Sequence, residues 1–226
     1  MNNIDNINTL RVIGPFNTGN NLCKQILLQN SSGHKWISTN SLELWKHCCN
    51  KEKLKEIIKN NKENLFIIMY KSLPFWIYSI KKMPYSIVWD KNNINSQCEM
   101  NINNHSEYNR VTFKNIAELH KQYYEIYMYL INKYDNVIFL NYHKLINRNN
   151  IYKYLSDNFN KYNITFNENI KYVLDRPSKV EGNPVRNSNE AILRSNKIID
   201  SINNNSVEKN FILKNLDEKI INFFEK

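Results

Sequence analysis

The fold is decided by a short apolar segment that stops at a glycine and leads through a polar loop into a helical pattern, Leu10-Arg11-Val12-Ile13-Gly14-Pro15-Phe16-Asn17-Thr18-Gly19-Asn20-Asn21-Leu22. The apolar part is hydrophobic on both faces, as buried parallel strands are. A strand, a glycine-containing loop and a helix in this order turn backbone N–H groups toward an anion at the helix N-terminus. The segment therefore predicts an α/β fold with a phosphate-binding loop.

Glycine is scarce in the chain. Its 226 residues include only Gly14, Gly19, Gly33 and Gly182, whereas asparagine fills 42 positions. This composition is typical of a gene biased toward A and T, so many Asn and Lys residues need no functional interpretation. A glycine kept in such a chain indicates a backbone geometry that other residues adopt poorly.

Two further apolar runs, at 65–70 and 137–140, also have the pattern of buried strands. Helical spacing marks residues 20–29, 51–59, 113–134, 145–159 and 208–225. Alternating strands and helices predict an α/β domain with a central, mainly parallel sheet flanked by helices. We expect one domain over 1–226, with a frayed end at 1–9 and Asn-rich loops at 91–109 and 200–206.

Composition excludes several classes of protein. The chain is 42% hydrophobic, which is enough for a core, and no apolar run approaches the roughly 18 residues of a membrane helix. The N-terminus lacks the pattern of a secretory signal, and the cysteines form no CxxC pair, which predicts reduced thiols, a cytoplasmic location and no metal site. The net charge of +10 suits an anionic ligand or reflects codon bias, and the absence of long basic runs argues against nucleic acid.

The loop departs from the common nucleotide-binding pattern. Gly14 and Gly19 have the spacing of a Walker A loop, but Asn20 and Asn21 replace its Lys and Ser or Thr. An ordinary ATPase or GTPase is therefore disfavoured. A ligand-free strand–turn–helix, in which Thr18 or Asn20 caps the helix, is the structural alternative.

The loop resembles the 5′-phosphosulfate loop of sulfotransferases that use PAPS (3′-phosphoadenosine 5′-phosphosulfate). A second match follows the strand at 65–70, where Lys71 and Ser79 have the spacing of that family's 3′-phosphate signature, with Trp76 between them. The resemblance implies the three-layer P-loop type of α/β fold. It also implies PAPS as co-substrate, PAP (3′,5′-ADP) as product, and no metal.

The resemblance also implies roles for individual residues. The 5′-phosphosulfate would lie on the loop residues Asn17, Thr18, Gly19, Asn20 and Asn21, although the family usually has Lys or Arg in place of Asn17. The other implied positions are Lys71 and Ser79 for the 3′-phosphate, Lys46 and His47 for the reacting centre, and Lys179 and Arg186 for a late loop that clamps the nucleotide.

Three alternatives concern the histidines. His34 is a rival to His47 as the base because it also neighbours a basic residue and a Trp. His120 lies in the long helix, where we expect it to be packed against the sheet or exposed rather than catalytic. His143 stands where the family usually has a glutamate, so we interpret it as structural.

The resemblance predicts transfer of a sulfuryl group from PAPS to a hydroxyl or amine of a small molecule or glycan. It identifies neither the acceptor nor the oligomeric state. The alternatives are a catalytically impaired nucleotide-binding relative and a P-loop nucleotide kinase with a degenerate loop.

Overall fold

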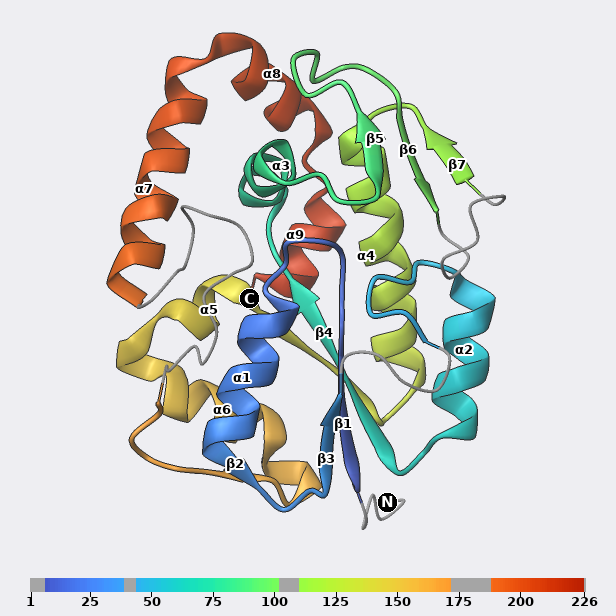
Figure 1. Cartoon of the computed structure of the whole chain (residues 1–226), viewed down its shortest axis with the longest axis vertical. Coiled ribbons are helices and arrows are strands. Elements are labelled where there is room, and N and C mark those ends of the chain that lie inside the picture. Colours follow the sequence, from blue (N-terminus) through green and yellow to red (C-terminus); the bar gives the residue numbers. More distant parts are fainter. Residues whose placement is uncertain (1–6, 39–43, 102–109, 172–187, 226) are drawn as a thin grey trace.

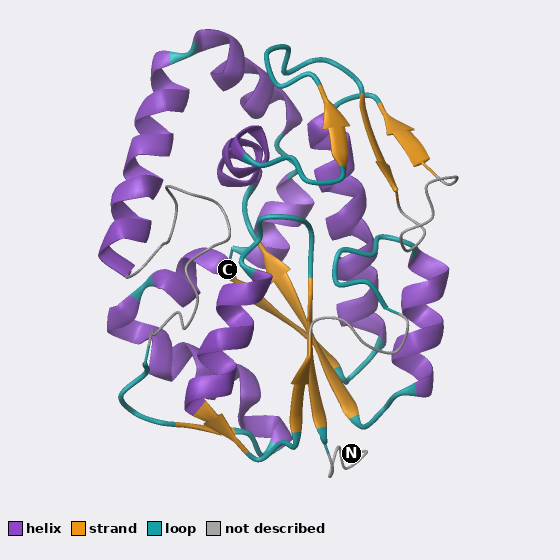
Figure 2. Cartoon of the chain, viewed as in Figure 1, coloured by secondary structure: helices purple, strands orange, loops and turns teal. Residues whose placement is uncertain are grey.

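The computed structural model describes residues 7–38, 44–101, 110–171 and 188–225. At its centre is a parallel sheet in the order β3-β1-β4-β8. Its strands are β1 (Thr9–Ile13), β3 (Trp36–Ser38), β4 (Asn64–Tyr70) and β8 (Val137–Asn141). Helices flank this sheet on both sides (Figures 1 and 2). The predicted α/β fold with a central parallel sheet is confirmed.

Alternate residues of β4 build the two halves of the core. All seven residues of this strand are buried. Phe66, Ile68 and Tyr70 pack with α2 (Lys51–Asn60), α4 (Ile116–Lys133) and α9 (Glu218–Phe224). Leu65 and Ile67 face the other way, onto α1 (Asn20–Asn30) and α6 (Ile151–Phe159). A strand that is apolar on both faces therefore occupies the middle of a three-layer arrangement.

Shorter elements surround this framework. The remaining helices are α3 (Leu73–Lys82), α5 (Tyr142–Ile146), α7 (Ser188–Asn204) and α8 (Ser206–Asn215). A small antiparallel sheet contains β5 (Ile87–Trp89), β6 (Cys98–Asn101) and β7 (Arg110–Phe113), and β2 (Ser31–Ser32) pairs with β9 (Thr165–Phe166). The edge strand β3 of the main sheet and the β5–β6–β7 sheet have no counterpart in the sequence prediction, because short strands give weak hydropathy patterns.

Four predicted segments need correction. The Asn-rich loop expected at 91–109 contains β6 (Cys98–Asn101), and residues 102–109 lie outside the described residues. The expected helix at 145–159 is divided into α5, a 3₁₀ turn at Arg148–Asn150 and α6. The expected helix at 208–225 is divided into α8 and α9, and Asp217 caps the second of these. The loop expected at 200–206 is wrong, because α7 continues to Asn204 and α8 begins at Ser206.

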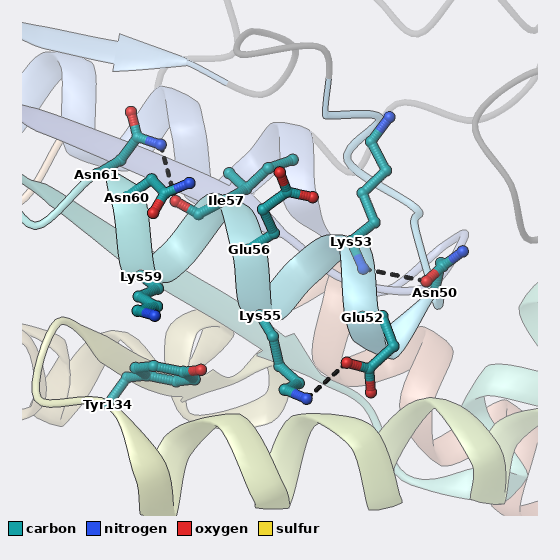
Figure 3. Close-up of a pocket in the computed structure, with 10 residues that line it drawn as sticks. All are labelled: Asn50, Glu52, Lys53, Lys55, Glu56, Ile57, Lys59, Asn60, Asn61 and Tyr134. Atoms are coloured by element: carbon teal, nitrogen blue, oxygen red, sulfur yellow. Dashed lines mark hydrogen bonds and ion pairs between the residues drawn. The ribbon is translucent and has the colours of Figure 1, made fainter.

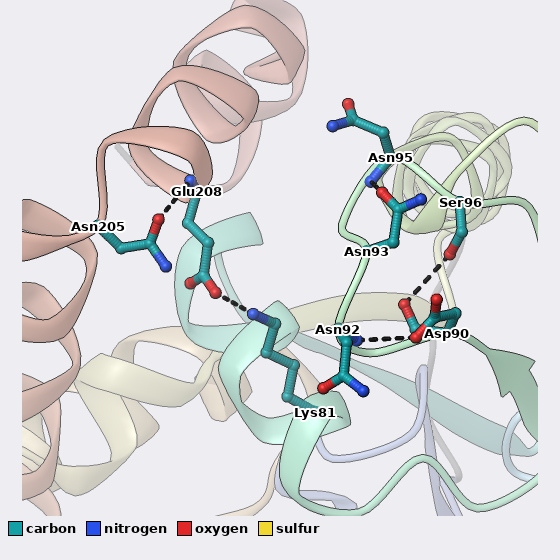
Figure 4. A network of polar contacts seen from close by, with 8 residues as sticks. All are labelled: Lys81, Asp90, Asn92, Asn93, Asn95, Ser96, Asn205 and Glu208. Carbon is teal, nitrogen blue, oxygen red and sulfur yellow. Dashed lines mark hydrogen bonds and ion pairs between the residues drawn. The ribbon is translucent and has the colours of Figure 1, made fainter.

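Many asparagines have defined structural roles. The side chains of Asn50, Asn115, Asn141 and Asn205 accept backbone N–H groups at the starts of α2, α4, α5 and α8. Asn93 accepts the N–H of Asn95 in the β5–β6 connection (Figure 4). The fold thus uses these asparagines as helix caps and turns.

Polar contacts and aromatic packing attach the C-terminal helices to the sheet. Lys81 of α3 forms an ion pair with Glu208 of α8 (Figure 4). Phe224 of α9 stacks on Tyr70, the last residue of β4, with ring centroids 4.8 Å apart. These contacts fix α3 and α9 beside the carboxyl edge of the sheet, where the strands end.

Candidate functional site

A loop at residues 14–19 connects β1 to α1 at the carboxyl edge of the sheet, and Asn20 and Asn21 are the first residues of α1. Gly19 adopts a left-handed φ of 92°, and a Cβ there would lie 2.7 Å from Cδ2 of Tyr142. A Cβ on Gly14 would lie 2.9 Å from Oδ1 of Asn20. Both glycines are therefore required by the loop geometry.

The side chains of Thr18 and Asn20 hold the loop together. Thr18 Oγ1 donates to the carbonyl of Pro15 at 2.8 Å, and Asn20 Nδ2 donates to the carbonyl of Gly14 at 3.0 Å. Both residues are buried. These side chains are therefore engaged in shaping the loop.

The start of α1 has the electrostatic character of an anion site. No side chain caps this helix, and its first turn contains no acidic residue. Lys46 Nζ donates to Asn21 Oδ1 at 3.1 Å. Burial, assisted by the positive charge of Lys24, lowers the pKa of Lys46. A helix N-terminus flanked by lysines attracts negative charge.

Lys71 and Ser79 come together as the sequence predicts. Lys71 follows β4, Ser79 lies on α3, and Lys71 Nζ donates to Ser79 Oγ at 2.8 Å. Lys71 Nζ also donates to the carbonyl of Asn17 at 3.2 Å, which joins this pair to the loop. Lys71 is only 7% exposed, and burial lowers its pKa to about 7. No ion pair among the described residues includes it.

Asn17 faces away from the centre of the loop. Its Nδ2 donates to the carbonyls of Met83 at 2.7 Å and Ser79 at 3.2 Å, both at the end of α3. Its φ of 59° is left-handed, a conformation that Asn tolerates better than most residues. The Asn17 side chain therefore links the loop to α3, while its carbonyl contacts Lys71.

His47 lies directly against the loop. Its Nδ1 is 2.8 Å from the carbonyl oxygen of Gly14. Because a carbonyl only accepts, Nδ1 carries the proton in this contact, and Nε2 is the nitrogen that can accept one. The ring stacks on Phe16 with centroids 4.0 Å apart, and the carbonyl of Lys46 accepts the N–H of Gly14 at 2.8 Å. The pair predicted for the reacting centre is thus next to the loop.

The structure separates His34 from this region. Lys35 N donates to the carbonyl of Asn8, and Trp36 pairs with Thr9, so His34 precedes β3 at the amino edge of the sheet. The loop lies at the other end of β1. His34 is therefore excluded as a base for chemistry at the loop.

His120 is packed in the core rather than exposed, which decides between the two positions expected for it. It is 4% exposed, and its Nε2 contacts the carbonyl of Lys71 at 3.0 Å. Burial lowers its pKa to about 4, so the ring is neutral and Nε2–H donates.

Sequence reasoning missed the part of the site formed after β8. The ring of Tyr142 lies beneath Lys71 Nζ, 4.3 Å from it, and blocks any Cβ on Gly19. The neighbouring His143 packs on Phe75 of α3, with ring centroids 4.2 Å apart. The available signal was position, since the carboxyl ends of adjacent parallel strands meet at one edge.

The aromatic residues near the loop differ in exposure. Trp76 is fully buried and donates Nε1–H to the carbonyl of Phe16 at 2.6 Å. Tyr85 is 59% exposed and stacks on Phe16 with ring centroids 5.5 Å apart. Trp76 therefore supports the loop from below, whereas Tyr85 presents a ring to solvent.

Other features lie away from this site. Lys179 and Arg186, predicted to clamp the nucleotide, fall outside the described residues. An open pocket of about 770 Å³ follows α2 and Tyr134 (Figure 3), but it contains none of the predicted residues and is lined mainly by the exposed face of one helix. All four cysteines are buried free thiols. Within the described ranges, no cluster of three metal-ligating side chains occurs and no helix is long and apolar enough to cross a membrane.

Comparison with protein-family models, curated proteins and solved structures found no match to this chain. The functional argument therefore rests on the geometry of the loop, of Lys71 and Ser79, and of the residues around them.

Proposed function

We propose that this chain is a PAPS-dependent sulfotransferase of the three-layer P-loop type. The observation that carries the proposal is the contact between Lys71 and Ser79, 2.8 Å apart, beside a loop residue from the preceding strand–loop–helix unit. A buried lysine without a carboxylate partner is costly unless an anion joins it. A phosphate monoester suits this pair because it accepts the charged donor of Lys71 and, once the Ser79 hydroxyl turns from the carbonyl of Phe75 to which it donates at 2.9 Å, a neutral donor as well.

The two ends of PAPS have separate places in this proposal. The 5′-phosphosulfate lies over the N-terminus of α1 and takes the backbone N–H groups of the loop. The 3′-phosphate takes Lys71 and Ser79, to which the carbonyl of Asn17 is also close. Asn17 links the two regions through its own backbone.

The transfer step uses the residues beside the loop. The acceptor hydroxyl or amine attacks sulfur, the bond between sulfur and the bridging phosphate oxygen breaks, and PAP leaves with that electron pair. His47 Nε2 takes the acceptor proton, because Nδ1–H is held by the carbonyl of Gly14. Lys46, close to Asn21, offsets the charge that develops on the leaving oxygen. The acceptor is a small molecule or a glycan.

Isothermal titration with PAP and with 5′-AMP, which lacks the 3′-phosphate, tests the binding site. Wild type should bind PAP more tightly than 5′-AMP. Lys71→Ala and Ser79→Ala should each weaken PAP binding tenfold or more and leave 5′-AMP binding nearly unchanged. Lys133→Ala, at an exposed position of α4, is the matched control. Absence of PAP binding by wild type would refute the proposal, and magnesium-dependent ATP hydrolysis would favour a nucleotide kinase.

One observation favours a second function, that of a catalytically impaired PAP-binding relative. The side chain at position 17, where the resembled family has a cation, is here an amide directed at Met83 and Ser79. Measured PAPS turnover with mixed hydroxyl and amine acceptors distinguishes the two functions. Turnover that His47→Asn abolishes supports the transferase, whereas tight PAP binding without turnover supports the binding protein.

A further inference from the structure

The residues that follow β8 lie beside Lys71. β4 and β8 are paired so that Tyr70 is opposite Asn141. Lys71 and Tyr142 are therefore the next residues beyond this pair, and Lys71 Nζ lies 4.3 Å from the centre of the Tyr142 ring. His143 follows immediately, and its backbone N–H donates to Asn141 Oδ1 at 2.8 Å. That bond fixes the backbone from which the imidazole extends.

The imidazole of His143 has an unmet hydrogen-bonding capacity. Its Nε2 is buried and has no hydrogen-bond partner within the described part of the chain. The ring is held against Phe75, one turn before Ser79 on α3. A buried polar atom without a hydrogen-bond partner costs free energy, and in a native structure it is explained by a bound water, an ion or a functional role.

The electrostatic surroundings of His143 favour an anion. Burial, together with the positive charge of Lys71, lowers the pKa of His143 to about 4. The other groups that pack on it are the rings of Phe75 from α3 and Tyr142 from α5. On the α6 side, the neighbouring Lys144 lies over the Tyr154 ring. Among the described residues, no carboxylate forms an ion pair with Lys71 or His143, and the charge of Lys71 acts on His143, so these two basic groups have no described counter-ion.

We propose that His143 is a third ligand of the phosphate held by Lys71 and Ser79, and that it donates Nε2–H to a phosphate oxygen. The inference rests on the proposed function, in which this group is the 3′-phosphate of PAPS. In the proposed complex one anion would be contacted from three elements, by Lys71 after β4, by Ser79 on α3 and by His143 at the start of α5. A bound phosphate dianion favours the protonated forms of Lys71 and His143 and so raises both pKa values. Binding is therefore accompanied by proton uptake.

Calorimetry of PAP binding tests the inference through both affinity and protons. Titration at pH 8 in buffers of different ionisation enthalpy gives the number of protons taken up. His143→Gln should weaken PAP binding about tenfold, reduce proton uptake and leave 5′-AMP binding unchanged. His143→Phe keeps the packing on Phe75 and should lose the same affinity, which controls for misfolding.

His34→Gln is the matched control. His34 also has a buried nitrogen without a partner among the described residues, but it lies at the opposite edge of the sheet. It should change neither PAP affinity nor proton uptake. If wild type binds PAP and both His143 variants match it in affinity and proton uptake, the inference is overturned and the proposed function stands. If wild type binds no PAP, both fail.

Discussion

Replacing Lys71 with methionine should make the protein more stable while removing its ligand affinity. Lys71 is 7% exposed, and burial lowers its pKa from 10.5 to about 7. In the unfolded chain the ammonium is solvated, so the folded state has a cost that methionine of similar length avoids. A lysine retained only for structure would give the opposite result.

The magnitude follows from the two pKa values. At pH 7 the difference costs the folded state about 4 kcal/mol, because each pKa unit is worth about 1.4 kcal/mol. Methionine cannot form the hydrogen bonds of Lys71 to Ser79 and to the carbonyl of Asn17, and this loss destabilises the variant by about 2 kcal/mol. Lys71→Met should therefore gain about 2 kcal/mol, or roughly 4–8 °C in Tm for a chain of this size.

The effect should depend on pH with a definite sign. Below pH 7 both states are protonated and the cost is complete, and it is relieved as pH rises from 7 toward 10.5. From pH 7 to 8.5, wild type should gain about 1.5 kcal/mol relative to Lys71→Met. Urea unfolding at both pH values measures this difference, with Lys133→Met as the control. A destabilised Lys71→Met, or a gap that does not narrow with pH, would show that the lysine is paired in the free protein.

Three further predictions concern the loop and its support. Gly19→Ala should cost about 2 kcal/mol or more and weaken PAP binding in the same titration, because φ is 92° and the Cβ meets Tyr142. Asn17→Ala should lower the free energy of unfolding in urea by about 1–2 kcal/mol, because it loses the hydrogen bonds to α3 and is strained at φ 59°. Asn17→Gly loses the same bonds without the backbone strain, so it should cost less. Asn115→Ala should lower stability by about 1 kcal/mol in thermal melts, since its side chain accepts two N–H groups at the start of α4, whereas exposed Asn132→Ala should not.

Hydropathy alone predicts the sheet strands that are long and apolar. β1, β4 and β8 lie within about one residue of the predicted runs, because both faces of each strand are buried. β3 covers only Trp36–Ser38, and its pairing with β1 depends on a partner distant in sequence. The split between α5 and α6 depends on the side chain of Asn147, which accepts the N–H of Asn149. Such local hydrogen bonds leave no periodic signal.

The candidate site likewise contains residues that the sequence places correctly and residues whose position depends on the tertiary structure. Spacing brings Lys71 and Ser79 together, because a strand end and the next helix have a fixed relation over eight residues. His143 comes from another strand, 72 positions beyond Lys71, so its proximity depends on the order of strands in the sheet. The orientation of the Asn17 side chain depends on where α3 ends. Neither fact can be read from residue types.

Several features that oppose folding are concentrated at the carboxyl edge of the sheet. Asn17 and Gly19 have left-handed backbones, and among the described residues Lys71 is buried without a counter-ion and His143 Nε2 has no hydrogen-bond partner. The amino edge of the sheet has some of the same features. Gly33 has a left-handed backbone, and His34 Nδ1 has no hydrogen-bond partner among the described residues.

The two edges differ in what an anion would relieve. A Cβ on Gly33 would lie 2.4 Å from the carbonyl oxygen of Asn163, so packing alone accounts for that glycine. The pKa of His34 is lowered by burial only, whereas the pKa of His143 is lowered by burial and by Lys71. At the amino edge a bound anion would meet one histidine. At the carboxyl edge it would favour the protonated forms of two basic groups at once, so a single bound anion would offset several local costs there, as we propose for the phosphate.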